Sequence, residues 1–388
     1  MTLRRVVVVG NGIAGLSACD ALRSAGFDGR LTVVGAEKHQ PYSRPALSKA
    51  LLHGEDQLSA HQLPDPSHGA EEILGVAAAG LDTVANLVRL DDGTELPYDG
   101  LVIASGSSAR RLGGADSPEL TLRTIEDAVA LKNRVATGSP TVIVVGGGAL
   151  GMEIASGALQ QGCRVTLVSD VQPLSRQLGS HLSGVFIDAA RRSGLRFVTA
   201  GKARLAGTAQ APAVALQDGV VLSADVVVST VGDEPNTAWL QDSGLLTGGR
   251  LLADSRGRVG PGIVAAGDVA AFPGAGGHGR VPLWTSAIEQ AKTAALGLLQ
   301  GDAAPELSFQ PYFWTEGFGL SLKVAGPAPM TGKPSFAETG TSADSMLLRW
   351  EDADGRGTAA ALNYRIPVPK LRRLANLGPS ALRPAVRV

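Results

Sequence analysis

Two glycine-rich turns constrain the fold of this chain more than any other feature. Residues 10–15 read G-N-G-I-A-G directly after an apolar run, and residues 146–151 read G-G-G-A-L-G after another. In the pattern G-x-G-x-x-G, the first glycine makes the turn between a strand and a helix. The second lets the backbone approach a pyrophosphate, and the third lets helix and strand pack closely. The N-terminus of the helix adds about half a positive charge that faces the phosphates.

Both turns stand between a predicted strand and a predicted helix, which is the context that this pattern requires. One match alone would be a weak signal. Two matches in one chain predict two dinucleotides bound at once, most simply FAD and a nicotinamide cofactor. The alternative is a pair of ordinary glycine-rich turns in an α/β protein.

Apolar periodicity repeats a strand–helix–strand order around each turn. Two short apolar strands that end in small residues, 101–106 and 226–232, read as points where the chain passes from one domain to another. After residue 309 the composition changes, which predicts a small separate α+β domain. The other predicted strands are 6–9, 31–35, 142–145, 165–169, 345–350 and 358–362, and the predicted helices are 14–25, 150–161 and 285–299. A third apolar segment that ends in glycine and aspartate, 262–268, precedes the last of these helices.

Length and composition bound the class of protein. A chain of 388 residues is expected to hold two or three domains, and its 44% hydrophobic content supports a real core. The formal net charge of −1 excludes a global basic field for nucleic acid. No apolar run reaches about 18 residues, so no membrane-spanning helix is expected. The expected location is the cytoplasm.

The two cysteines, Cys19 and Cys163, lie far apart in the sequence. No C-x-x-C or C-x-x-x-x-C pair is present, so a disulfide relay is not expected. Both residues read as small packing side chains.

These motifs, in this order, resemble the FAD-dependent ferredoxin reductases of oxygenase systems, which use NAD(P)H and have a glutathione-reductase-like fold. The most specific segment is 41–49, P-Y-S-R-P-A-L-S-K, close to the family's P-Y-D-R-P-P-L-S-K. The resemblance implies an α/β chain with two Rossmann-like dinucleotide-binding domains and a small C-terminal α+β domain. The FAD-binding domain would comprise 1–108 and 233–308, the inserted NAD(P)-binding domain 109–232, and the C-terminal interface domain 309–388.

The resemblance also implies a set of site residues. Lys49 and Glu153 are the expected catalytic residues: Lys49 would favour the anionic reduced flavin, and Glu153 would lie near the nicotinamide ring. A solvated loop and a surface helix are the respective alternatives. The residues expected to bind a cofactor are Gly10, Gly12, Ile13, Ala14, Gly15, Glu37, Arg44, Lys49, Ala104, Ser105, Gly106, Arg110, Gly146, Gly148, Gly151, Glu153, Asp170, Gly232, Gly267, Asp268 and Trp284. Those at the first turn are expected around FAD, and Gly146, Gly148 and Gly151 around the nicotinamide cofactor.

Some of these assignments have alternatives. Glu37 is expected to bond the adenosine ribose, but an acid of the family often stands at the position of Ala36. Asp268 would accept a hydrogen bond from the ribityl chain or a flavin phosphate, and it could also cap the segment that follows. Trp284 would pack at the flavin edge or belong to the core.

The chain departs from the family pattern at three places. The strand-end acid that usually selects NADH is Ser169 here, with Asp170 beside it and Arg176 as the nearest arginine. NADH is favoured, because Asp170 would repel a 2′-phosphate. Pro282 stands where the family usually has Glu, and residues 315–317, T-E-G, replace the usual S-D-Q.

The resemblance implies hydride transfer from NAD(P)H to FAD, followed by single electrons to a [2Fe–2S] ferredoxin. An acid-free basic stretch near the C-terminus would steer an acidic ferredoxin, or is a solvated tail without a partner. One alternative is an FAD enzyme of secondary metabolism that acts directly on a small molecule. Another is an NADH-sensing flavoprotein that acts through a partner. The basic residues are Arg365, Lys370, Arg372, Arg373, Arg383 and Arg387.

Overall fold

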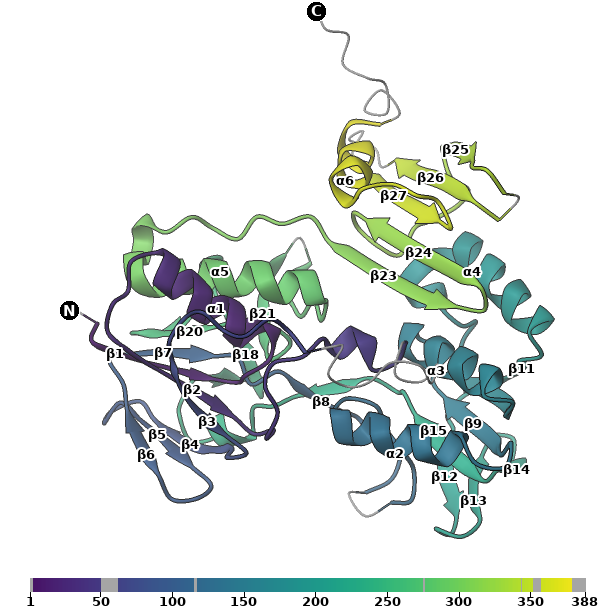
Figure 1. The fold of residues 1–388 in the computed structure, drawn as a ribbon, viewed down its shortest axis with the longest axis horizontal. Helices are drawn as coiled ribbons and strands as arrows, with labels where there is room; N and C mark the ends of the chain where they lie inside the picture. Colours follow the sequence, from purple (N-terminus) through teal and green to yellow (C-terminus); the bar gives the residue numbers. More distant parts are fainter. Residues whose placement is uncertain are drawn as a thin grey trace, which may run out of the picture. The chain divides into compact units, whose positions relative to one another are not determined.

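The computed structural model describes residues 3–49, 62–114, 117–274, 276–342, 344–351 and 357–378 (Figure 1). The chain forms two compact units. The first comprises Met1–Ser43, Ser59–Ser108 and Glu234–Phe309, and the second comprises Arg44–Leu58, Ala109–Asp233 and Gln310–Val388. Each unit contains a mainly parallel sheet with a glycine-rich turn after one of its strands, so the predicted α/β class is confirmed.

The first unit is built on a six-stranded sheet in the order β19-β20-β7-β1-β2-β3. The central strand β1 (Arg5–Val9) pairs in parallel with β2 and β7. Because side chains alternate along a strand, Val6 and Val8 face the core beneath the helices, and Val7 and Val9 face a second core. The other strands are β2 (Arg30–Gly35), β3 (Glu71–Leu74), β7 (Gly100–Ile103), β19 (Arg258–Gly260) and β20 (Ile263–Ala265).

Helices α1 (Ile13–Ser24) and α5 (Trp284–Gln300) lie side by side against this sheet (Figure 1). Small residues such as Ala18 and Ala294 fill their shared core, which allows a close approach of the two helices. The second core is covered by an antiparallel meander, β4 (Ala78–Asp82), β5 (Leu87–Leu90) and β6 (Glu95–Pro97), and by a further sheet, β17 (Leu246–Thr247), β18 (Arg250–Leu252), β21 (Ala270–Gly274) and β22 (Gly277–Gly279).

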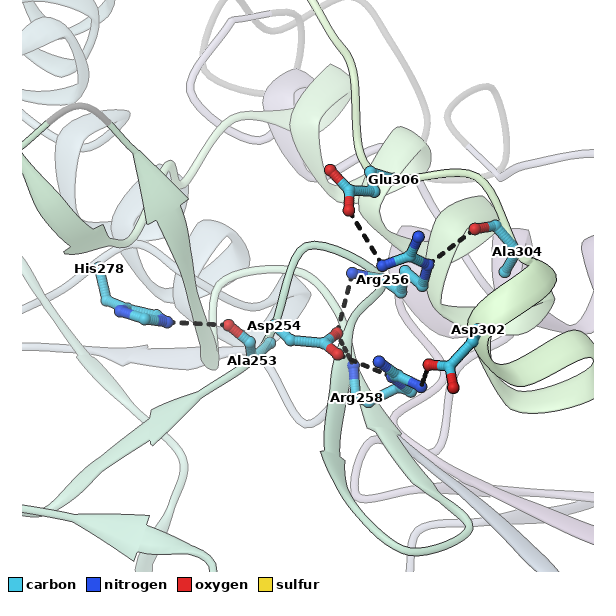
Figure 2. Close-up of polar contacts among 8 residues, drawn as sticks. All are labelled: Ala253, Asp254, Arg256, Arg258, His278, Asp302, Ala304 and Glu306. Carbon is cyan, nitrogen blue, oxygen red and sulfur yellow. Dashed lines mark hydrogen bonds and ion pairs between the residues drawn. The ribbon is translucent and has the colours of Figure 1, made fainter.

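A polar cluster ties the loop between β18 and β19 to the segment after α5 (Figure 2). Arg258 pairs with Asp254 at 2.7 Å and with Asp302 at 2.6 Å. Arg256 pairs with Glu306 at 3.0 Å. Exposed ion pairs contribute little to stability. We therefore assign this cluster a positional role, which is to fix the loop against the end of α5.

The second unit contains a four-stranded parallel sheet in the order β11-β10-β9-β15. The valine-rich strand β9 (Thr141–Val145) pairs with both β10 and β15. A three-stranded antiparallel sheet packs on its face through a shared apolar core. The other elements are α2 (Ile125–Val135), α3 (Ala149–Gln160), β10 (Arg164–Ser169), α4 (Ser175–Arg192), β11 (Arg196–Thr199), β12 (Arg204–Gly207), β13 (Pro212–Ala215), β14 (Val221–Ser223) and β15 (Val226–Ser229). The chain passes between the units at β8 (Ser107–Ala109) and β16 (Asp233–Pro235).

The C-terminal part of the second unit is a five-stranded antiparallel sheet with one helix, α6 (Val368–Leu377). Arg349 is 2% exposed and stabilises this part from within. Its Nε donates to the carbonyl of Leu374 near the end of α6, at 3.0 Å, and its guanidinium pairs with Glu351 at 2.8 Å. The strands are β23 (Tyr312–Gly317), β24 (Leu320–Ala325), β25 (Phe336–Thr339), β26 (Met346–Glu351) and β27 (Gly357–Leu362).

Within the described residues, no helix combines the length and apolar character that a bilayer span requires.

Candidate functional site

The first glycine-rich turn has the geometry that a bound pyrophosphate requires. Gly10 has a φ of +118°, and a Cβ there would lie 2.1 Å from the carbonyl oxygen of Ala104. A Cβ on Gly15 would lie 1.8 Å from the carbonyl oxygen of Gly10. A Cβ on Gly12, by contrast, would meet nothing within 4 Å. The outer glycines therefore allow close packing, and the middle one leaves open space for a ligand.

The second turn repeats this arrangement in the other unit. Gly146 has a φ of +119°, and a Cβ there would lie 2.3 Å from the carbonyl oxygen of Thr230. A Cβ on Gly151 would lie 2.0 Å from the carbonyl oxygen of Gly146. A Cβ on Gly148 would meet one neighbour, the side-chain amide nitrogen of Gln177, at 3.4 Å. The same division of roles among three glycines thus occurs twice.

The helices after the two turns begin without a side-chain cap. Gly12 and Gly148 are the N-cap residues of α1 and α3, and neither helix has an acid in its first turn. Helix α2 shows the ordinary alternative, a capping box of Thr124 and Asp127. The first N–H groups of α1, which begins at Ile13, and of α3 therefore remain for a phosphate, so the residues present fit a dinucleotide at each turn.

The first unit brings several other predicted residues to its turn. Ala104 lies under Gly10, as described above. A Cβ on Gly267 would lie 2.9 Å from the Cβ of Ala14, so the Gly267–Asp268 backbone passes beside the start of α1. The hydroxyl of Ser107 donates to Asp268 at 3.4 Å. Asp268 thus lies in the part of the unit where the resemblance places FAD.

The segment 104–106 is fixed by bonds that cross to the chain after β16. The amide nitrogen of Asn236 donates to the carbonyl of Ser105 at 2.8 Å, and the Ser105 hydroxyl donates to the carbonyl of Asn236 at 2.9 Å. The Asn236 N–H also donates to the carbonyl of Gly106, which has a φ of +68°.

Glu37 and Trp284 are two further predicted residues of this unit. Glu37 follows β2 and accepts a hydrogen bond from the hydroxyl of Tyr42 at 2.5 Å, whereas Ala36 is exposed. Trp284 is half-buried as the first residue of α5. Ala287, three residues further, approaches the position of a Cβ on Gly267 to 3.8 Å, so the start of α5 reaches the turn region.

In the second unit, the two predicted catalytic residues form a buried ion pair. The Nζ of Lys49 lies 3.0 Å from the carboxylate of Glu153, and their side chains are 14% and 6% exposed. Neither alternative, a solvated loop for Lys49 or a surface helix for Glu153, describes these positions. Lys49 also donates to the carbonyl of Pro45 at 3.2 Å.

Two hydroxyl groups that sequence reasoning did not assign complete this cluster. The hydroxyls of Ser48 and Thr315 both donate to the carboxylate of Glu153, the latter at 2.6 Å. The Lys49 ammonium lies 6.0 Å from the ring centroid of Trp314, within the range of a cation–π contact. Ser48 lies inside the segment 41–49, so that motif could have indicated its place in the site. For Thr315 the sequence offered no indication beyond its departure from the family pattern.

The end of β10 differs from the expectation in one respect. Arg176 is more than the nearest arginine in the sequence: its guanidinium holds the carboxylate of Asp170 through two hydrogen bonds of 2.8 and 3.2 Å. The pair is exposed at the start of α4. Ser169 is buried and its hydroxyl donates to the carbonyl of Val171. Asp170 therefore carries a partly compensated charge.

Arg44, Arg110 and Gly232 lie in the second unit as well. Arg44 donates to the carbonyl of Arg123 at 2.8 Å. The N–H of Arg110 donates to the carbonyl of Gly232, at 3.0 Å, where the chain passes between the units. The cofactor contacts of all the site residues stay predictions.

Neither cysteine has the environment of a redox thiol. Cys19 and Cys163 are buried and unbonded to one another. Burial raises the pKa of Cys19 to about 12 and also raises the pKa of Cys163, so little thiolate forms near neutral pH.

We expect Cys19→Ala/Cys163→Ala to keep its turnover with an electron acceptor, apart from a stability loss of roughly 1–2 kcal/mol. A loss of acceptor turnover of about 100-fold, with flavin reduction by NADH unchanged, would reveal a thiol relay.

The basic stretch of the C-terminal part is largely exposed. Arg365, Lys370 and Arg373 are exposed on or beside α6. Arg372 is half-buried, with its guanidinium 5.9 Å from the ring centroid of Tyr312. Arg383 and Arg387 lie outside the described residues.

Comparison with known proteins gives consistent matches over most of the chain. A family model described as pyridine nucleotide-disulphide oxidoreductase matches residues 4–291. The chain is 32% identical over 389 residues to the ferredoxin–NAD(+) reductase subunit of the benzene 1,2-dioxygenase system of Pseudomonas putida, covering 96% of this chain and 91% of that protein. It is 35% identical over 334 residues to rhodocoxin reductase of Rhodococcus erythropolis, covering 83% and 78% respectively.

A solved structure with a similar fold is the covalent putidaredoxin reductase–putidaredoxin complex. The match has a TM-score of 0.84 at 25% identity and covers 96% of this chain and 93% of that chain.

Proposed function

The chain belongs to the pyridine nucleotide-disulphide oxidoreductase family, and from this premise we propose that it is a reductase that passes electrons from NADH through FAD to a [2Fe–2S] ferredoxin. One observation carries the proposal: two matching, uncapped glycine turns stand in separate units. A Cβ on the middle glycine would meet nothing within 4 Å in the first turn and only the Gln177 amide nitrogen, at 3.4 Å, in the second. The chain lacks a redox cysteine pair. Electrons therefore leave from the flavin itself.

When bound, FAD would supply two-electron chemistry with the nicotinamide and one-electron chemistry with the acceptor. The first turn would offer the N–H groups of Ile13 and Ala14 to the FAD pyrophosphate, and Asp268 and Glu37 would orient the cofactor by accepting hydrogen bonds. We assign the FAD-binding domain to the first unit and the NAD(P)-binding domain to residues 109–232 of the second. Lys49 provides positive charge for the reduced cofactor, and Glu153 and its hydroxyl donors hold the ammonium in place.

We further propose NADH as the preferred reductant. Asp170 and Arg176 engage one another, so a 2′-phosphate would have to break their two hydrogen bonds before it could bind the arginine. A ribose 2′-OH can donate to Asp170 without that cost.

The proposed acceptor follows from the relatives and from charge. The matched relatives include the ferredoxin reductase component of the benzene dioxygenase system. The exposed face of α6 carries Lys370 and Arg373, with Arg365 beside it, and would attract an acidic partner. We propose a cytoplasmic location, where buried, unpaired thiols such as Cys19 stay reduced.

The test is electron delivery to a [2Fe–2S] ferredoxin at low ionic strength. We expect Lys370→Glu/Arg373→Glu to lower kcat/KM for the ferredoxin about tenfold, because two attractive charges become repulsive. The rate with ferricyanide, a small acceptor, should not change. Added salt should shrink the difference, because it screens exposed charges.

A matched control reverses Arg192 and Arg196, which are exposed elsewhere on the same unit. Arg192→Glu/Arg196→Glu should keep the ferredoxin rate. If kcat/KM for the ferredoxin fell equally in both variants, the rate would depend on the net charge of the protein and not on the position of the basic residues. NADH consumption that needs a small molecule and ignores ferredoxin would replace this proposal by a flavoenzyme acting on that molecule.

A further inference from the structure

The segment that follows β10 bends back over the second glycine turn. The N–H of Leu174 donates to the carbonyl of Gly147 at 2.7 Å, which fixes the segment to the turn itself. Three residues later, the side chain of Gln177 places its amide nitrogen 3.4 Å from the position of a Cβ on Gly148. That position is the space which the middle glycine of the pattern leaves for a pyrophosphate.

Two unusual backbone conformations isolate the turn that carries Gln177. Leu174 has a φ of +63°, which is uncommon and costly for a residue with a bulky side chain. Gly179 has a φ of +75° and a ψ of 176°, so the helix is interrupted there. The four residues between them, 175–178, form one separate helical turn. Local strain of this kind concentrates at ligand-binding sites.

The surrounding structure holds this turn in place on both sides. Before it, the hydroxyl of Ser183 donates to the carbonyl of Pro173 at 2.6 Å. After it, a Cβ on Gly179 would lie 1.8 Å from the carbonyl oxygen of Met330, so only glycine fits this close approach. The position of Gln177 therefore follows from the fold and is not the result of a free surface loop.

Gln177 and its neighbour Arg176 differ in how their side-chain donors are used. Arg176 is engaged by Asp170 through both of its terminal nitrogens. Gln177 is exposed, and within the described residues its amide makes no hydrogen bond. An amide group offers two N–H donors, which suit a phosphate oxygen.

We propose that Gln177 is a coenzyme-binding residue whose amide donates a hydrogen bond to the pyrophosphate of the nicotinamide dinucleotide at Gly148. The inference rests on the proposed function, because it takes the second turn as the nicotinamide site. It adds a side-chain donor from α4 to the backbone donors of α3. A neutral donor binds the phosphates that NADH and NADPH share, so Gln177 acts on affinity and not on the choice between them.

A charge series at position 177 tests the proposal by equilibrium binding. ADP-ribose is titrated calorimetrically into the FAD-loaded protein, since it contains the pyrophosphate but no nicotinamide. We expect Gln177→Leu to raise the Kd about tenfold, because a hydrogen bond to a charged group is lost. Gln177→Glu should raise the Kd further, and Gln177→Lys should lower it, most at low ionic strength.

Gln160→Glu is the matched control. It makes the same chemical change on an exposed residue at the far end of α3 and should bind ADP-ribose as the unmodified protein does. If the Leu, Glu and Lys variants all bound ADP-ribose with the Kd of the unmodified protein, the assignment of Gln177 would be overturned. A Kd that rose by the same factor in all three variants would overturn it as well. Gly148→Arg separates this outcome from the failure of the proposed function. If it also leaves ADP-ribose binding unchanged, the second turn is not the nicotinamide site.

Discussion

Gly148→Arg should abolish reduction of the flavin by NADH while FAD stays bound. The position of a Cβ at Gly148 is open except for the amide of Gln177, so an arginine side chain would occupy the space assigned to the pyrophosphate. We expect the apparent affinity for NADH to fall at least about 100-fold, since the phosphate contacts at the helix N-terminus are lost together. Stopped-flow bleaching of the flavin with NADH and NADPH is the measurement.

FAD should remain because the first turn lies in the other unit. The purified variant should be yellow, and acid should release FAD from it. Gly184→Arg is the matched control: the same substitution in the same unit, at a glycine of α4 whose Cβ would meet nothing within 4 Å. It should bleach at the normal rate. Loss of FAD from Gly148→Arg, with the circular dichroism intact, would mean that the two sites are assigned in reverse.

Local patterns predicted the two βαβ units well. The helices predicted at 14–25 and 150–161 are observed as Ile13–Ser24 and Ala149–Gln160, each shifted by one residue. The glycine roles were also predictable, because the turn geometry depends on a few consecutive residues. Periodicity and short motifs report on residues that are close in the sequence, and these helices and turns are formed by such residues.

The contacts between distant segments were not predictable in the same way. Thr315 and Glu153 are 162 positions apart, and only the packing of β23 on α3 brings the hydroxyl to the carboxylate. Arg176 and Asp170 are six positions apart, but the left-handed backbone at Leu174 turns the chain so that they meet. The same turn places Gln177 beside Gly148. No helical or strand periodicity signals such a bend.

The buried pair of Lys49 and Glu153 gives the second large expected effect. Lys49→Met leaves the Glu153 carboxylate, which is 5% exposed as a residue, without its counter-charge. Removing one partner of a buried ion pair costs about 3 kcal/mol or more. Flavin reduction by NADH should also slow about 100-fold, because a charge assigned to stabilise the reduced flavin is gone. Denaturant unfolding and stopped-flow reduction measure the two effects.

The double variant Lys49→Met/Glu153→Gln separates the two effects from one another. Glutamine keeps an oxygen that can accept from Ser48 and Thr315 but carries no charge, so most of the lost stability should return. The slow flavin reduction should persist, because the positive charge is still absent. Lys370→Met, at an exposed lysine of α6, should change stability by less than about 0.5 kcal/mol. If the double variant also regained the reduction rate, Lys49 would serve only to neutralise Glu153, and its assignment to the flavin would be wrong.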